Sequence, residues 1–319
     1  MKDFRNIIFV LVILVFILQM VVIKKDSVNQ TDNSKPIISL STFSLYDITK
    51  HIAGDSVELV MILPFGVDAH SFEPTPKLMA KIQSSALVVY SGAGLEPWID
   101  GFEFKNDVIN MSQHVKLREL ESKEDEHEEH AHHEHHHDEH CNHSGVDPHY
   151  WLDINNMIKS TNIIKDSLIK IAPQHKELYE KNTQIYIEML QNLDSEYKNR
   201  IKECKIDTII VNHNAFSYLS NNYGFNVEAL SGLSPEAQPS AKNMIKIIEH
   251  VKEHNISTIF FESFVSDKAI KSIASEAKVS VDVLQPLGNI TADEADKNAS
   301  YEEIMKLNLE KISHALECK

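Results

Sequence analysis

Short apolar runs alternate with segments of helical period from Pro36 onward. The runs have the length of strands, and the segments between them have apolar positions at helical spacing. This is the pattern of βαβ units with a parallel sheet. In the first half of the chain we expect strands at Ile37–Leu40, Val57–Leu63 and Ala86–Val89, helices at Phe43–Ile52 and Pro76–Ser84, and more helix after Val89.

A long helical stretch divides the chain. Asn155–Ile171 has a helical period, Pro173 interrupts it, and Gln174–Cys204 continues it for about 30 residues, or roughly 45 Å. A helix of that length exceeds what one domain needs. We interpret it as a strut between two lobes.

The alternation of strands and helices resumes beyond Cys204. Strands are expected at Asp207–Val211, Asn226–Leu230, Thr258–Phe261 and Val279–Leu284, and helices at Ala215–Tyr223, Ser240–His254, Asp267–Lys278 and Tyr301–Cys318. The sequence therefore predicts an α/β protein with an N-terminal lobe at residues 36–154, a helical linker at 155–204 and a C-terminal lobe at 205–319. Ligands of such sheets bind at the carboxyl ends of the strands, which two lobes would bring together in a cleft.

The N-terminus indicates export. Lys2 and Arg5 precede an apolar run of 17 residues, Ile7–Ile23, that contains only Gln19 as a polar residue. The run is long enough to span a bilayer and no Ala-x-Ala-like site follows it, so we favour an uncleaved anchor at residues 1–25 over a cleaved signal. Residues 26–35 would tether an extracytoplasmic body. No cysteine precedes Cys141, which excludes a lipoprotein signal.

The net charge is informative about partners only when it is assigned to separate parts of the chain. The 319 residues are 42% hydrophobic and carry a net charge of −16, but residues 119–143 alone hold ten acids against the single base Lys123. The remaining excess is mild and no basic patch is evident, so we expect no nucleic-acid partner.

That acidic segment is also rich in histidine, and we expect a flexible loop at residues 119–146 because nothing apolar would fix it. Imidazole suits transition metals, and carboxylates add charge and weaker oxygen ligands. The loop should bind several ions loosely, although a solvated linker without such a role is the alternative. Its imidazoles are His127, His130, His132, His133, His135, His136, His137, His140 and His143.

Four further residues lie at or near the ends of predicted strands. They are His70, His149, His213 and Gln285. A lone histidine is more often an ordinary surface or buried residue than a ligand. Three imidazoles contributed by both lobes, however, make a closed metal site, and Asn212 and Asn214 could orient them.

The three cysteines are too few for a disulfide framework. Cys141 lies in the histidine-rich loop. Cys204 and Cys318 could form a disulfide, but the sequence cannot show whether they are close.

Five motifs occur in the order known from a protein family. They lie at Pro64–Pro76, Gly92–Trp98, Asp147–Asp153, Asn212–Phe216 and Gly232–Ser240. With these motifs, residues 36–318 closely resemble the cluster A-I metal-binding proteins of bacterial zinc and manganese ABC importers. The resemblance implies two lobes joined by one long rigid helix, with His70, His149 and His213 as metal ligands. It also implies a membrane permease as the partner, and we expect a monomer.

The resemblance favours the zinc branch of that family. Manganese binders carry a carboxylate where this chain has His213, and the histidine-rich loop is typical of zinc binders. At the fourth ligand position, relatives carry an acid in or just after a segment that here reads Leu284-Gln285-Pro286-Leu287-Gly288. We therefore expect three histidines, with water or a carboxylate from elsewhere as the fourth ligand.

These observations predict a high-affinity zinc carrier that captures extracytoplasmic Zn²⁺ and delivers it to an ABC permease. Zinc would be transported cargo, not a catalytic cofactor. The alternatives are a manganese or iron binder of the same architecture and a surface adhesin. A zinc hydrolase would need a general base, for which Glu236 or Glu262 is available, but the chain has no His-Glu-x-x-His pair and we expect no enzyme.

Overall fold

The computed structural model describes residues 35–119, 145–232, 241–262 and 268–319. The predicted anchor, nearly all of the tether, the nine loop histidines, Cys141 and Glu236 lie outside these residues. Residues 36–319 form one compact unit. Among the described helices, none combines the length and the apolar character needed to cross a membrane.

The N-terminal lobe is a parallel four-stranded sheet in the order β2-β1-β3-β4. Its strands are β1 (Ile37–Leu40), β2 (Glu58–Met61), β3 (Leu87–Tyr90) and β4 (Asp107–Asn110). The helices that accompany them are α2 (Phe43–Ala53) and α3 (Pro76–Gln83). Helix α3 begins where Thr75 accepts a hydrogen bond from the backbone N–H of Leu78 and Pro76 takes the first helical position.

The helix predicted after β3 is wrong. The chain there makes a turn through Gly92, Ala93 and Gly94, all with positive φ, then a 3₁₀ turn at Pro97–Ile99, and then enters β4. Three consecutive residues in the left-handed region cannot continue a right-handed helix. At Gly92 only glycine fits, since an added Cβ would lie 2.0 Å from Oδ1 of Asn110.

Two helices connect the lobes. Helix α4 (Ile154–Ile171) starts at Asp153, which accepts a hydrogen bond from the backbone of Asn155, and Pro173 begins the 3₁₀ turn that separates it from α5 (Lys176–Arg200). Helix α5 is 25 residues long, or about 37 Å. It ends four residues earlier than the sequence pattern suggested.

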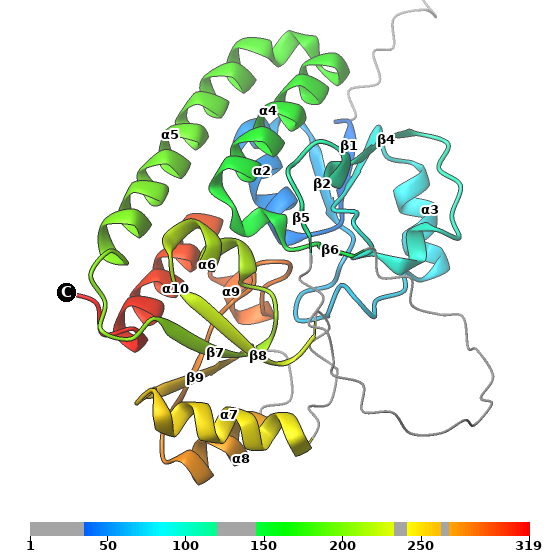
Figure 1. Ribbon diagram of the computed structural model, residues 1–319. Coiled ribbons are helices and arrows are strands. Elements are labelled where there is room, and N and C mark those ends of the chain that lie inside the picture. The colour runs from blue at the N-terminus through cyan, green and yellow to red at the C-terminus, as the bar shows by residue number, and fades with distance from the viewer. Residues whose placement is uncertain (1–34, 120–144, 233–240, 263–267) are drawn as a thin grey trace, which may run out of the picture. The chain divides into compact units, whose positions relative to one another are not determined.

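Helix α5 contacts both lobes, as its course along one side of the unit shows (Figure 1). The amide of Asn182 donates to the carbonyl of Ile52 in α2. The hydroxyl of Tyr197 donates to the carbonyl of Met305, in the last helix of the chain. The long helix thus carries the strut role that the sequence predicted.

The C-terminal lobe repeats the design with a parallel sheet in the order β10-β9-β7-β8. Its strands are β7 (Thr208–His213), β8 (Asn226–Ser231), β9 (Thr258–Phe261) and β10 (Ser280–Val283). Its helices are α6 (Ser217–Tyr223), α7 (Ala241–Glu253), α8 (Lys268–Ala277), α9 (Ala292–Asp296) and α10 (Tyr301–Ala315). The predicted fold class, two parallel α/β lobes joined by a long helix, is confirmed.

The segment after β10 docks the C-terminal lobe on the N-terminal one. The indole N–H of Trp151 donates to the backbone carbonyl of Pro286 over 2.7 Å. The backbone N–H of Phe43 donates to the backbone carbonyl of Gly288 over 3.0 Å. The amide of Asn289 donates to the carbonyl of Pro64 over 2.7 Å. One hydrophobic core also runs through both lobes and the linker. The cleft between the sheets therefore has a defined width.

Cys204 and Cys318 form a disulfide, which settles the pairing that the sequence left open. Cys204 follows the end of α5 and Cys318 follows α10, so the bond closes a loop that contains the whole C-terminal lobe. The neighbouring Lys205 and Glu317 side chains form an ion pair over 2.8 Å. The disulfide lies at the end of the lobe that is remote from the cleft residues described below.

Replacing both cysteines, Cys204→Ser with Cys318→Ser, should lower the free energy of unfolding by about 2–5 kcal/mol, because the unfolded chain regains the entropy that a loop of this length restricts. Denaturant unfolding of the wild type and the double variant measures the difference. Zinc affinity should not change. An unfolding midpoint equal to that of the wild type would show that the bond contributes nothing to stability.

Candidate metal site

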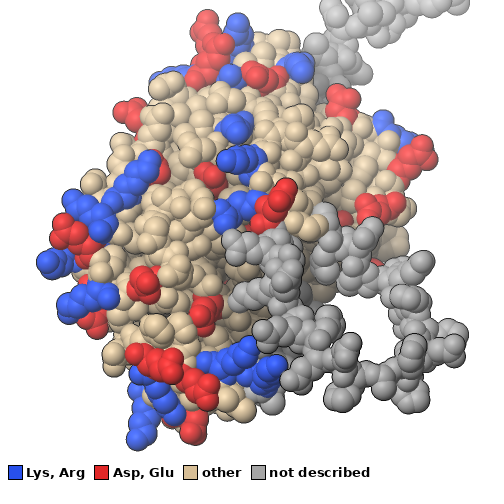
Figure 2. Space-filling model, in the orientation of Figure 1, with Lys and Arg blue, Asp and Glu red and all other residues tan. Residues whose placement is uncertain are grey.

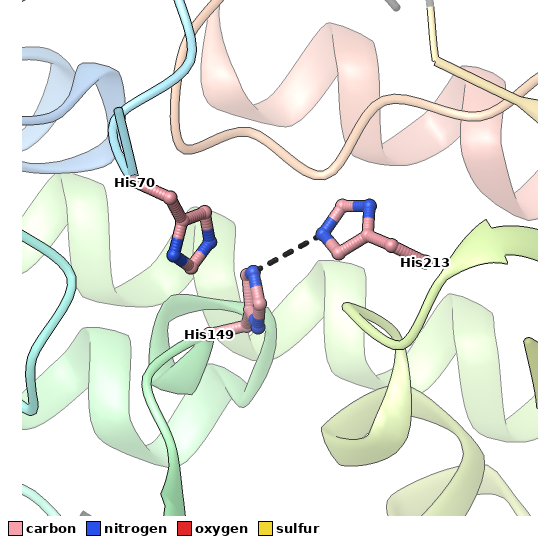
Figure 3. A group of neighbouring side chains, drawn as sticks. All are labelled: His70, His149 and His213. Carbon is pink, nitrogen blue, oxygen red and sulfur yellow. Dashed lines mark hydrogen bonds between the residues drawn. The ribbon is translucent and has the colours of Figure 1, made fainter. Parts of the chain in front are cut away.

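Three histidines from distant parts of the sequence meet between the lobes. His70 lies in the loop after β2, His149 directly precedes the 3₁₀ turn Tyr150–Leu152, and His213 is the last residue of β7. Figure 3 shows the three rings pointing toward one another. The sequence had placed His213 two residues beyond its strand, whereas the strand runs on to His213 itself.

The spacing of the rings suits one small ion. Nitrogen atoms of the three imidazoles all lie within 4.8 Å of one another, and the Nε2 atoms of His149 and His213 are 3.4 Å apart. Two nitrogens bound to one tetrahedral zinc, each at 2.0–2.1 Å, would be about 3.3 Å apart. In the part of the chain that the structure describes, this is the one such group of histidine, cysteine and acidic side chains.

His149 and His213 are each only 2% exposed, and His70 is partly exposed. The Nε2 atoms of His149 and His213 face each other at hydrogen-bonding distance, and an ion bound by both rings would need an electron pair from each of these nitrogens. The Nδ1 atoms of both rings are hydrogen-bonded to buried carboxylates.

Asp147 fixes the His149 ring. Its Oδ1 atom accepts hydrogen bonds from Nδ1 of His149 over 2.7 Å and from the backbone N–H of the same residue over 2.9 Å. A proton held at Nδ1 leaves Nε2 with a free electron pair directed at the other rings. Burial tends to raise the pKa of Asp147, but the attraction of His149 and hydrogen bonds from His149 and Ser217 outweigh it, so that its pKa is lowered.

Glu262 holds His213 in the same way. Its carboxylate is hydrogen-bonded to Nδ1 of His213, and both side chains are buried. From the sequence we considered Glu262 only as a general base and named Asn212 and Asn214 as residues that could orient the histidines. For His149 and His213 the Nδ1 partners are carboxylates instead. One sequence feature could have identified Glu262 as a partner of His213: it directly follows β9, which lies beside β7 in the sheet.

The cavity that the histidines line has a volume of about 20 Å³, room for an ion and little more. Its other walls are mainly apolar, and it is bounded by Val67, Asp68, Ala69, Leu95, Trp151, Glu262, Pro286, Gly288 and Asn289. An apolar wall around an ion strengthens its attraction to the ligands and keeps competing water away.

Gln285, the residue suggested for the fourth position, does not line this cavity. Its side-chain amide donates to both carboxylate oxygens of Glu294, over 2.9 and 3.0 Å. Gly288, which does line the cavity, has no side chain to offer, and an added Cβ would lie 3.1 Å from Cζ2 of Trp151. The segment that carries an acid in relatives therefore supplies no ligand here.

A buried carboxylate supports the cavity wall from the N-terminal lobe. Glu96 accepts hydrogen bonds from the backbone N–H groups of Ser91 and Gly92, over 2.8 and 2.9 Å, and from the hydroxyl of Ser41. These bonds hold the glycine turn that places Leu95 against the site. Burial raises the pKa of Glu96 to about 6.

Two parallel α/β lobes with convergent imidazoles between them define a two-lobed metal-binding protein. Residues 38–315 match the model of the family described as "Zinc-uptake complex component A periplasmic". The chain belongs to this family, which confirms the resemblance recognised in the motifs.

The similar proteins include zinc-binding members. The chain is 36% identical over 279 residues to the high-affinity zinc uptake system protein ZnuA of Bacillus subtilis, covering 86% of this chain and 85% of the relative. It is 32% identical over 287 residues to the zinc-binding lipoprotein AdcA of Streptococcus pneumoniae, covering 89% of this chain but only 56% of that relative. The chain thus spans about half the length of AdcA.

Two solved structures show the same fold at similar identity. The metal-dependent lipoprotein YcdH of Bacillus subtilis superposes with a TM-score of 0.73 at 31% identity, covering 88% of this chain and all of that one. The Zn(II)-bound ZnuA-like domain of Streptococcus pneumoniae AdcA gives a TM-score of 0.72 at 31% identity, covering 89% of this chain and all of that domain.

The raised pKa of Glu96 predicts a pH-dependent stability. The folded state holds the proton of Glu96 more tightly than the unfolded state, so the stabilisation from protonation is complete below about pH 4.5 and is lost as the pH rises through about 6. The free energy of unfolding of wild type minus that of Glu96→Gln should fall by about 2 kcal/mol across this window. Urea unfolding of the metal-free proteins measures it.

The matched control is Glu103→Gln, which changes an exposed glutamate in the same lobe. Its difference from the wild type should stay constant over the same pH range. A constant difference for Glu96→Gln as well would contradict the raised pKa.

Proposed function

We propose that this protein is the extracytoplasmic zinc-binding component of an ABC importer, and that His70, His149 and His213 bind the ion that it delivers to the permease. The observation that carries the proposal is the convergence of three imidazoles on one small buried cavity. Membership of a family of zinc-uptake components supports zinc as the cargo.

The charge of the site favours a divalent ion. Three neutral imidazoles supply no charge, but Asp147 and Glu262 stand directly behind two of them, hydrogen-bonded to Nδ1. Two carboxylates balance the two positive charges of zinc, which makes burial of the ion tolerable. The three nitrogen donors also favour zinc over manganese, which prefers oxygen ligands.

The fourth position would be taken by water, since the described residues bring no fourth ligand into the group. An open position on zinc is also found in hydrolases. Glu262, however, already accepts a hydrogen bond from His213 and is therefore not placed to act as the general base of a hydrolase. We therefore propose a carrier that performs no chemistry.

We further propose that residues 1–25 anchor the protein, that residues 26–35 tether it outside the membrane, and that it acts as a monomer. Export of the body is consistent with its disulfide, since such bonds persist in oxidising compartments. Basic and acidic side chains are interspersed over the face that Figure 2 shows.

Substituting the ligands tests the proposed function. In the full-length protein, His70→Ala, His149→Ala and His213→Ala should each lower zinc affinity by more than about 100-fold, because even residues behind the ligands contribute 10–100-fold. Competition with a chelator measures the affinity, and elemental analysis the bound metal. His114→Ala, a change at an exposed histidine, is the control.

Loss in the three variants and not in the control, with zinc preferred over manganese, would establish the zinc carrier. Tight manganese binding that survives His213→Ala would instead assign the protein to the manganese branch. Full zinc affinity in all three variants would place the tight site elsewhere in the chain.

The histidine-rich loop can be tested separately. Its ends leave the paired strands β5 (Arg118–Glu119) and β6 (Val146–Asp147), in which Glu119 lies opposite Val146, so a short turn can replace residues 120–144. Capture of zinc, sensing of excess zinc and buffering are all open to such a loop, and of these we propose capture when zinc is scarce. Deletion should remove several weak sites and leave one tight site, as zinc titration would measure; loss of the tight site would refute this division.

A further inference from the structure

Asp147 connects the two lobes at the metal site itself. One of its carboxylate oxygens accepts from His149, in the N-terminal lobe, and the other accepts a short hydrogen bond from the hydroxyl of Ser217. Ser217 is the first residue of α6 in the C-terminal lobe, four residues after His213. Asp147 is 1% exposed and Ser217 is partly buried, so the link lies at the inner end of α6.

The next residue of α6 strengthens the connection. The hydroxyl of Tyr218 donates to the backbone carbonyl of Asp147 over 2.8 Å and accepts from the backbone N–H of Arg118 over 2.9 Å. Arg118 lies opposite Asp147 in the β5–β6 pair. Helix α6 therefore bonds to both strands of the β5–β6 pair, of which β6 leads directly to His149, and Ser217 bonds to the carboxylate that accepts from the His149 ring.

Together these bonds join the two histidines in a closed series of contacts around the ion site. Ser217 follows His213 by four residues, and its hydroxyl donates to Asp147. The carboxylate of Asp147 accepts from the ring of His149. The Nε2 atoms of His149 and His213 then face each other across 3.4 Å. The contacts of residues 286–290 hold the lobes together but act on backbone carbonyls, not on a ligand. Ser217 is placed to set the separation of two ligands contributed by different lobes.

We propose that Ser217 is a positioning residue for zinc: its hydroxyl fixes Asp147, and through Asp147 the His149 ring, at the distance from His213 that zinc requires. This inference rests on the proposed function. A side chain that only stabilised the start of α6 would affect folding but not the geometry of the bound metal. The two roles therefore differ in what a metal probe reports.

The test is zinc affinity and the visible spectrum of bound cobalt(II), which reports the geometry of the ligands, in full-length Ser217→Ala and Ser217→Thr. Ser217→Ala should bind zinc about 10-fold more weakly, with a changed cobalt spectrum. Ser217→Thr keeps the hydroxyl and should restore both. Ser160→Ala, which removes a buried hydroxyl bonded to the backbone carbonyl of Asn156 within helix α4, should change stability alone.

Wild-type zinc affinity and an unchanged cobalt spectrum in Ser217→Ala would overturn the positioning role. So would a loss that Ser217→Thr shares in full, since that would reflect packing and not the hydroxyl. His149→Ala separates the two hypotheses: if it abolishes tight binding while Ser217→Ala does not, only the positioning role fails. If His149→Ala binds zinc as tightly as the wild type, the proposed site itself fails.

Discussion

Three imidazoles can bind one ion only if each offers it a nitrogen without a proton, and the carboxylates behind two of them favour the tautomer that does so. Asp147 and Glu262 accept from Nδ1 of His149 and His213, so the free electron pairs of both rings point inward. The same carboxylates supply negative charge for a divalent cation. In the proposed site, ligand direction and charge balance thus follow from one kind of hydrogen bond.

That arrangement depends on two lobes held at a fixed separation. His149 belongs to the N-terminal lobe, and His213 ends a strand of the other sheet. A single hydrophobic core runs through both lobes, helix α5 bonds to each of them, and the segment after β10 docks beside Trp151. A site built across such an interface needs little reorganisation to bind the ion, and any change in lobe packing alters it directly.

The segment that carries an acid in relatives has a structural reason to supply no ligand here. Gly288 lies against the indole of Trp151, and the amide of Gln285 is bonded to Glu294, which also caps helix α9 through Thr291. Neither position can present a carboxylate without displacing these contacts. In the proposed site, zinc would therefore be held by three imidazoles, with no fourth ligand from this segment.

The sequence by itself determined the features that depend on local spacing. The alternation of apolar runs and helical periods predicted two parallel sheets and a long helix, and the motifs around His70, His149 and His213 predicted the family and the residues that meet. Local patterns failed where glycine geometry decided the path: the turn at Gly92–Gly94 led into β4 instead of a helix.

Only the tertiary structure decided which side chains stand behind those ligands. Glu262 is 49 residues from His213, and Ser217 is 70 residues from Asp147, yet each pair is hydrogen-bonded. The Cys204–Cys318 disulfide spans 114 residues. A sequence pattern shows the period of a strand or helix. Contacts between residues far apart in the sequence depend on how the two lobes pack, and the spacing of residues within one element does not specify that packing.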